Sequence, residues 1–276
     1  MGLPIHKTEI MSEQKSSFLN TPGDQKTEVV EALVPSAVEA LERASVDVQI
    51  TTAHKFPRSL ELFQKRALSM ATLDEETAES CIYSRPVGKD QDGKQKFVEG
   101  ASIRLAEIVA ASYGNIRVAA RLIEQTPRYV KAEGVAHDLE SNYAGKSEVI
   151  ESTVDKNGRP FSERMQIVVA KAVLAKAYRD AVFKVVPKAL CRTVYLSALK
   201  IINGSGKTIE QRREKVKEWL RSIKVDDARV FATLGVSGWT DVGDRQLELL
   251  TGIKTAISDN DATIDEAFPP LSAVEQ

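Results

Sequence analysis

The sequence predicts an α+β fold. Helices surround a three-stranded antiparallel β-meander that is followed by a long basic helix, and a small all-α domain lies near the C-terminal end. Three observations lead to this prediction. Between residues 115 and 154 the apolar side chains alternate with polar ones, which is the period of strands. Before and after that stretch they recur every three or four residues, as in helices. The chain has 276 residues, a length that suggests one or two domains.

Four segments are expected along the chain. Residues 1–27 are rich in Ser, Thr, Lys, Glu and Gln, a composition typical of a disordered tail. Residues 28–203 form the α+β core, and residues 208–268 form a small acidic helical domain. Residues 203–206 (Asn-Gly-Ser-Gly) predict a flexible joint between the two, and residues 269–276 form a second tail.

The first half of the core should contain four helices and a hairpin before the meander. A short helix over 28–45 is expected to be interrupted at Pro35, because proline lacks the N–H that a helix interior needs. Apolar residues at helical spacing follow Pro57, and a short helix spans 73–82. Residues 84–99 predict a hairpin that turns at Asp92-Gly93. Residues 101–112 predict an amphipathic helix that Gly114 ends.

The meander and the helices after it follow from alternation, turns and caps. Strands are expected over 115–124, 128–138 and 147–154, with a tight turn at 155–158. A long helix begins after the N-cap Ser162 and reaches Lys184, and Pro187 breaks or restarts it before it continues to about Ile202. Further helices are expected over 208–224, 226–234, 244–257 and 263–268.

The charge of the chain is near zero only as a total. Residues 1–54 carry four basic and eight acidic residues, a net charge of −4, and residues 225–276 carry three basic and ten acidic residues, a net charge of −7. The segment between them carries 31 basic and 21 acidic residues, a net charge of +10. A basic body with acidic flanks indicates a polyanion as the partner, although a neutral surface partitioned at random would give a similar pattern.

The positive charge is concentrated in residues 164–200, which hold eight basic residues and Asp180 as the one acid. We call these eight residues the basic row: Arg164, Lys171, Lys176, Arg179, Lys184, Lys188, Arg192 and Lys200. Four of them are spaced by multiples of four and tend to one helical face. Arg117, Arg121 and Lys131 are expected on the outer face of the strands. Such a row can neutralise phosphates in a salt-dependent way, or it can be a solvated helix face.

Aromatic residues are interspersed with these cations at Tyr113, Tyr129, Phe161, Tyr178 and Phe183. Aromatic rings that stack on bases give sequence-tolerant binding of single strands. The same rings can equally belong to the core. Tyr113, Phe161 and Tyr178 are the candidates for stacking.

Other functional classes find little support in the sequence. Cys81 and Cys191 lie far apart and form no CxxC or Cys/His cluster, so a zinc site is not indicated. Gly206-Lys207-Thr208 resembles part of a phosphate loop, but the glycine needed five residues earlier is replaced by Ile201. The sequence lacks the apolar run needed to span a bilayer and lacks an apolar signal peptide, which predicts a cytoplasmic protein.

The order of these elements resembles the phage single-strand DNA annealing proteins of the RecT/Red-beta group. Residues 99–139 (EGASIRLAEIVAASYGNIRVAARLIEQTPRYVKAEGVAHDL) resemble the core of a widespread group of phage-encoded proteins, and residues 247–268 (LELLTGIKTAISDNDATIDEAF) resemble the tail of RecT-like recombination proteins. The resemblance covers about residues 57–268 and consists of patterns of elements rather than catalytic signatures.

The resemblance implies ATP-independent annealing by a recombinase that assembles into rings or filaments in the bacterial host cell. DNA would lie in a basic groove beside the sheet and the long helix. Carried onto this sequence, the phosphate contacts are Arg104, Arg117, Arg121, Lys131, Arg164, Lys171, Lys176, Arg179, Lys184, Lys188 and Arg192. The partners would be single-stranded DNA, annealed duplex and further copies of the chain. The acidic domain would contact a host single-strand-binding protein or a partner exonuclease.

Two other functions stay open. The first is a Mg²⁺-dependent nuclease, for which Glu99, Glu107, Glu133 and Asp138 are scattered candidates without a motif that selects them. The second is a phage interaction protein whose basic face contacts an acidic partner. Annealing proteins do not turn over a substrate, so the preferred interpretation is not an enzyme, and no motif implies a cofactor.

Overall fold

The computed structural model describes residues 24–91, 95–155, 157–204 and 206–271. The chain divides into two compact units, residues 1–49 and 50–276. Helix α1 (Asp24–Lys55) begins in the first unit and is continuous through Pro35. The interruption expected there is therefore wrong, because Ala, Glu and Leu around the proline favour helix strongly enough to continue it. The expected tail lies outside the described residues, apart from residues 24–27, which belong to α1.

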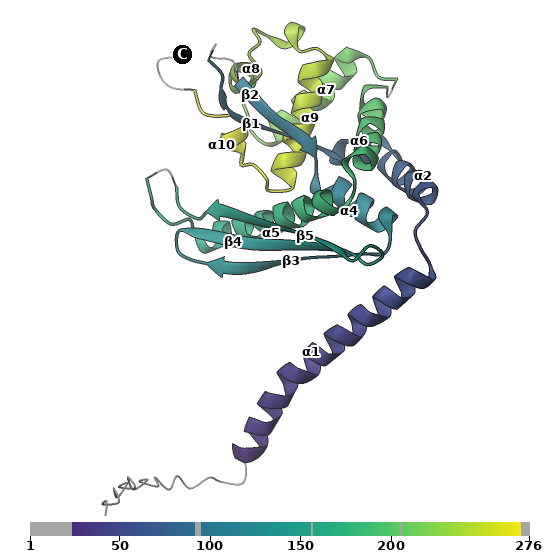
Figure 1. Ribbon diagram of the computed structural model, residues 1–276. Helices are drawn as coiled ribbons and strands as arrows, with labels where there is room; N and C mark the ends of the chain where they lie inside the picture. Colours follow the sequence, from purple (N-terminus) through teal and green to yellow (C-terminus); the bar gives the residue numbers. More distant parts are fainter. Residues whose placement is uncertain (1–23, 92–94, 156, 205, 272–276) are drawn as a thin grey trace, which may run out of the picture. The chain divides into compact units, whose positions relative to one another are not determined.

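The second unit has an α+β fold with an antiparallel three-stranded sheet (Figure 1). Strands β3 (Ile116–Gln125), β4 (Tyr129–Asp138) and β5 (Tyr143–Ser152) follow one another in space as they do in sequence. The meander expected from alternation is confirmed in its order of strands, but the third strand, expected over 147–154, starts and ends earlier. The register pairs Ala120 with Gly134 and Gly134 with Ser147. Paired residues point to the same face, so the register fixes which side chains share a face.

One face of this sheet is covered by the long helix α5 (Glu163–Val185), which starts at its predicted N-cap, Ser162. The contact is made by small residues, among them Ala132 on β4 and Ala177 on α5. At Gly134 a Cβ atom would lie 2.0 Å from the carbonyl oxygen of Ala177, closer than any side chain allows. The glycine therefore lets the helix backbone rest directly on the central strand.

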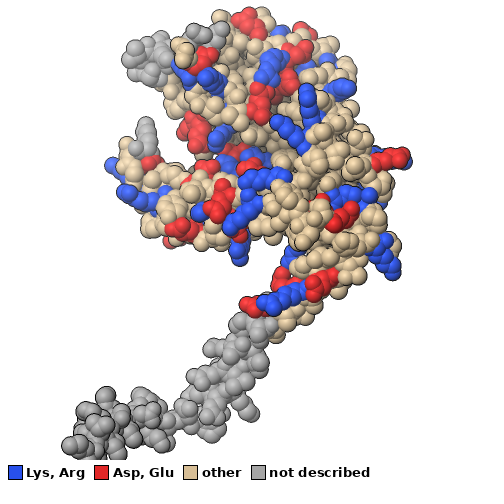
Figure 2. Space-filling view, in the orientation of Figure 1, with Lys and Arg blue, Asp and Glu red and all other residues tan. Residues whose placement is uncertain are grey.

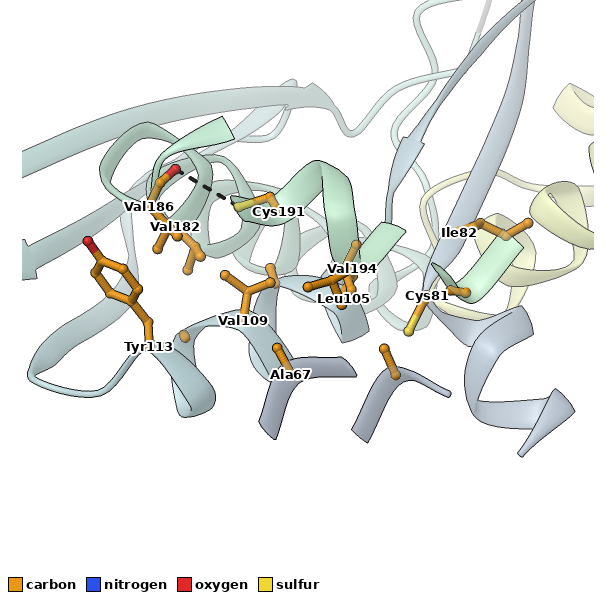
Figure 3. Packing of buried hydrophobic residues seen from close by; sticks show 14 of the residues in the cluster. Ala67, Cys81, Ile82, Leu105, Val109, Tyr113, Val182, Val186, Cys191 and Val194 are labelled. Atoms are coloured by element: carbon orange, nitrogen blue, oxygen red, sulfur yellow. Dashed lines mark hydrogen bonds between the residues drawn. The ribbon is translucent and has the colours of Figure 1, made fainter. Parts of the chain in front are cut away.

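The main hydrophobic core lies between α5 and a group of surrounding helices: α2 (Leu60–Ala71), α3 (Glu75–Ser80), α4 (Ile103–Tyr113) and α6 (Lys188–Asn203). Figure 3 shows part of this core, in which Val182, Val186 and Val194 face Leu105 and Val109. Both cysteines are buried in it as free thiols. Burial raises the pKa of the Cys81 thiol to about 12 and that of Cys191 to about 11.

A second antiparallel pair, β1 (Ile82–Lys89) and β2 (Gln95–Ala101), forms the hairpin expected before α4. Its predicted turn at Asp92-Gly93 lies outside the described residues. Strand β1 is covered by a helix from the other end of the chain, α9 (Asp244–Ser258). A Cβ at Gly252 of α9 would lie 2.6 Å from Cβ of Ser84, so the two backbones approach as closely as a glycine permits.

The remaining helices lie beside α9. They are α7 (Ile209–Ser222), α8 (Asp227–Leu234), the 3₁₀ turn η1 (Trp239–Asp241) and α10 (Ile264–Ala267). Their apolar cluster includes Leu220, Leu250 and Phe268, and Phe97 of β2 packs against it. The ion pairs Lys215–Glu79 and Arg245–Glu99 further join these helices to α3 and β2.

Candidate nucleic-acid interface

The basic row is carried by two helices that a proline separates. Helix α5 ends at Val185, and α6 begins at Lys188, directly after Pro187. Proline cannot donate the hydrogen bond that a continuous helix would require, so the predicted break is confirmed. Arg164 to Lys184 therefore lie on α5, whereas Lys188, Arg192 and Lys200 lie on α6.

In the middle of α5, the cations of the basic row are held by carboxylates from distant parts of the chain. Nζ of Lys176 lies 2.8 Å from Oε1 of Glu151 and 2.8 Å from Oδ1 of Asp261. Nη1 of Arg179 lies 3.4 Å from Oδ2 of Asp261, and its guanidinium lies over the ring of Tyr83. Burial alone would lower the pKa of Lys176, but Asp261 and Glu151 outweigh it and raise that pKa. These two cations are thus neutralised within the fold.

Arg117, Arg121 and Lys131 lie on the sheet face opposite to α5, where they are interleaved with acids. Arg121 pairs with Glu133 at 3.1 Å, and Lys131 pairs with Glu148 at 2.6 Å. Lys146 bridges the same two carboxylates. Arg117 is half-buried on β3. This face therefore carries charges of both signs rather than a continuous positive surface.

Three predicted residues, Arg104, Lys171 and Tyr178, meet in one surface hollow of about 470 Å³ beside β3. Arg104 pairs with Glu107 at 2.8 Å, and its Nε lies 3.9 Å from Oδ1 of Asp259. The side chain of Lys171 is exposed and forms no ion pair with any residue that the structure describes. Burial raises the pKa of the half-buried Tyr178. The hollow combines one free cation and one ring with two acids, Glu107 and Asp259.

A second hollow, of about 410 Å³, contains Phe161 and Lys176 together with several acids. Its acidic members are Glu151, Asp261, Asp265 and Glu266. Arg164 is exposed on the first turns of α5, without an ion pair to the described residues. A polyanion would meet mainly like charge in this hollow.

Tyr113 lies in the core. Its side chain is buried, its ring meets that of Phe63 edge to face at 5.6 Å, and the guanidinium of Arg58 covers it at 3.7 Å. The enclosed ring presents no face to a base. Phe161 and Tyr178 remain as the half-buried rings among the three stacking candidates.

Free positive charge and aromatic rings meet at the junction of α5 and α6. The exposed cations Lys184, Lys188 and Arg192, which we call the junction surface, lie around it. Lys184 donates a hydrogen bond to the carbonyl oxygen of Lys146 at 2.6 Å. The side chains of Lys188 and Arg192 have no ion pair or hydrogen bond with any described residue.

Beside the junction surface is a hollow of about 310 Å³, which we call the α6 hollow. It is lined by Gly100, Ala101, Phe183, Lys188, Cys191, Arg192 and Tyr195. Tyr195 is absent from the set predicted from the sequence, and Phe183 was not among the stacking candidates. The spacing of Lys188, Arg192 and Tyr195 at i, i+4 and i+7 is the signal that would have placed the tyrosine beside the cations.

Charge on the visible face of the molecule is mixed. Figure 2 shows Lys and Arg interleaved with Asp and Glu over the face drawn there. The ion pairs above explain this mixture, since most cations on the sheet and on the middle of α5 have carboxylate neighbours. The junction surface differs because no carboxylate lies within ion-pair distance of its three cations among the residues that the structure describes.

The described residues also bear on three other kinds of feature: a nucleotide site, a metal site and a membrane-spanning helix. Thr208 caps α7 in a reciprocal capping box with Gln211, and Lys207 pairs with Glu75, so the Gly-Lys-Thr sequence serves a helix start. In the described part of the chain, the His, Cys, Asp and Glu side chains do not group in threes that could hold a metal ion. Among the described helices, none combines the length and the apolar character needed to cross a membrane.

Comparison of the chain with protein-family models, with curated proteins and with solved structures finds no match.

Proposed function

We propose that the chain binds single-stranded DNA and anneals complementary strands without ATP, as a recombination protein of a phage. The observation that carries the proposal is the junction surface: three exposed cations, without carboxylate partners among the described residues, beside a hollow lined by two aromatic rings. Cations without carboxylate partners can exchange their counterions for phosphates, which is the main source of affinity for a nucleic acid.

The proposed mechanism needs only contacts to the strand. Lys184, Lys188 and Arg192 hold phosphates, and phosphate contacts position a strand without reading its sequence. The bases of that strand then stay available to pair with a second strand. Lys171, in the hollow beside β3, and Arg164, two turns before it on α5, provide further phosphate contacts. Lys176 is paired with Asp261 and Glu151, and Arg179 is paired with Asp261 and Asp180, so these two cations contribute only after those carboxylates have moved away.

The finer features of the proposal follow the resemblance to RecT/Red-beta-like proteins. The meander and α5 form the DNA-binding and oligomerisation core of a ring or filament. Residues 208–268 act as a small acidic helical domain that contacts a host single-strand-binding protein or a partner exonuclease. The protein needs no cofactor for this activity, and it acts in the cytoplasm of the bacterial host.

The test is annealing of complementary labelled oligonucleotides without ATP. Annealing is monitored by fluorescence energy transfer at a series of salt concentrations. Three phosphate contacts give a slope of about −2 in a plot of log K against log salt concentration for a single strand. The double variant Lys184→Glu/Lys188→Glu should lose strand binding and annealing. The matched control is Lys65→Glu/Arg66→Glu, a double charge reversal at exposed positions of α2, and it should behave as the parent.

Three results would contradict the proposal. If the parent does not bind the single strand at low salt, the junction surface would instead be assigned to binding of an acidic protein partner. Cleavage of the labelled strand on addition of Mg²⁺ would instead indicate a nuclease. A double variant that anneals as fast as the parent would remove the junction surface from the mechanism.

A further inference from the structure

We propose that the α6 hollow holds one base of the bound strand, while Lys188 and Arg192 hold the phosphate next to that base. This inference rests on the proposed function, and it adds a defined subsite to it. The hollow lies between the end of β2, the last turn of α5 and the first two turns of α6. Its volume of about 310 Å³ lies at the lower end of the range for small-molecule sites, as a single base requires.

The walls of the hollow suit an uncharged aromatic ring. Phe183 and Tyr195 are half-buried, and both pack against the main core, so their orientations are fixed by neighbouring side chains. Cys191 contributes a third wall, and Figure 3 shows its Sγ directed at the carbonyl oxygen of Val186, 3.9 Å away. None of the seven lining residues is acidic, which distinguishes the hollow from the two that contain Phe161 and Tyr178.

The polar part of the hollow suits an anion attached to that ring. Lys188 and Arg192 are one helical turn apart on α6, so their side chains lie side by side. Both are exposed and, among the described residues, both lack the carboxylate partners that neutralise Lys176 and Arg179. An apolar aromatic slot with two cations at its edge matches a nucleotide unit, in which a planar base is joined to a phosphate.

One occupied hollow per chain is compatible with annealing. A single base held on Phe183 and Tyr195 would anchor the strand and fix its position along the protein. The other bases would remain outside and would be free to pair. Aromatic stacking is tolerant of base identity, because every base has a π-face, so the subsite would not impose a sequence.

The test compares two decamers with the same phosphates: decathymidylate, and a decamer in which every base is replaced by an abasic site. Binding is measured by fluorescence anisotropy. The parent should prefer the base-bearing strand by about fivefold or more, as expected for stacking of one base. Tyr195→Leu keeps an apolar side chain but removes the ring, so it should lose most of this preference and leave the affinity for the abasic strand unchanged.

A charge variant tests the other half of the subsite. Arg192→Gln should weaken binding of both decamers by the same factor and should reduce the salt slope by about 0.7, since one phosphate contact is lost. Lys65→Gln on α2 and Leu196→Ala on α6 alter exposed positions outside the hollow, and these variants should bind both decamers as the parent does. Phe183→Leu provides a second ring deletion if Tyr195→Leu does not fold, as judged by its melting curve.

The possible failures can be told apart. A parent that binds both decamers equally, or a Tyr195→Leu variant with the full preference, would overturn the base subsite and leave the proposed function intact. A parent that binds neither decamer at low salt would overturn both. Free thymidine monophosphate that binds more tightly than the decamer would assign the hollow to a free nucleotide instead of a strand.

Discussion

The direct contact between α5 and the central strand makes Gly134 the position where the smallest change should have the largest effect. In Gly134→Ala the new Cβ would lie 2.0 Å from the carbonyl oxygen and 2.4 Å from the carbonyl carbon of Ala177. Both atoms belong to the helix backbone, so no side-chain rotation can relieve the contact. To reach an ordinary separation of 3.4 Å, the helix would have to move away by about 1.4 Å.

The cost follows from the packing that this displacement breaks. Overpacking of a core costs about 1–3 kcal/mol and occasionally more. We expect about 3 kcal/mol for Gly134→Ala, because the helix that must move also packs Val173 and Ala177 against Ala132. With a urea m-value of about 1–3 kcal/mol/M, that loss lowers the unfolding midpoint by at least about 1 M. The assay is urea-induced unfolding, monitored by circular dichroism.

The matched control is Gly238→Ala. Gly238 has an extended φ of −177°, and the nearest atom to its added Cβ is Oγ1 of Thr240 at 4.0 Å. That variant should stay within about 0.5 kcal/mol of the parent. Adding Ala177→Gly to Gly134→Ala should restore nothing, since the clash is with the backbone of residue 177. An unchanged midpoint for Gly134→Ala, or rescue by the second change, would refute the described packing of α5 on β4.

Three further predictions concern a cap and two ion pairs. Thr208→Ala should lower the free energy of unfolding by about 0.5–2 kcal/mol, because α7 loses its N-cap. Burial of Asp138 would raise the pKa of its carboxyl group, but the hydrogen bond and the charge of Arg58 outweigh burial and lower that pKa. The Asp138 carboxylate therefore stabilises the fold at pH values above its unfolded pKa, and this contribution is lost as the pH falls through its folded pKa. Asp138→Asn should therefore be less stable than the parent at pH 7 and should show a weaker loss of stability below about pH 4 in urea titrations. Asp261→Asn should destabilise the fold by about 1–3 kcal/mol, because the largely buried Lys176 and Arg179 lose the carboxylate charge that they share, and should raise the affinity for single-stranded DNA if the proposed function is correct.

Two of these predictions have a matched control variant. Thr193→Ala alters an exposed threonine within α6 that caps no helix, and it should not destabilise the protein. The control for Asp261→Asn is Asp265→Asn, four residues further along the chain. The Asp265 side chain is 74% exposed in its pair with Arg229, so this substitution should change the free energy of unfolding by less than about 1 kcal/mol. Equal effects of Asp261→Asn and Asp265→Asn on DNA affinity would show that only total charge matters. A parent whose stability does not change between pH 5 and 3 would contradict the role of Asp138.

Local patterns were enough to predict most of the secondary structure. The alternation over 115–154 predicted the meander, Ser162 predicted the start of α5, and Pro187 predicted the break before α6. Each of these signals acts within a few residues, so the sequence alone reports it. Pro35 is the exception, since one proline did not stop a helix whose neighbours favour continuation.

The candidate site was harder to predict because its properties depend on distant partners. Periodicity placed Lys176 and Arg179 on a helix, but it could not show that Asp261, which follows them by 85 and 82 residues, would lie against them. It also could not separate Tyr113, whose ring is enclosed by Phe63 and Arg58, from a ring on the surface. Charge counts describe a segment of the sequence. Whether a cation in that segment can bind an external anion depends on which acidic side chains the fold brings next to it.

The close contact of α9 with β1 has a consequence during synthesis. Strand β1 is complete once residue 89 has been made, but the helix that covers it ends at residue 258. At about 5–20 residues per second, roughly 8–34 s of translation separate the two events. During this interval the hairpin has no cover on the side that Gly252 later occupies. Completion of the C-terminal helices is therefore the step that closes this part of the fold, because Ser84 and the backbone beside it stay uncovered until α9 has been made.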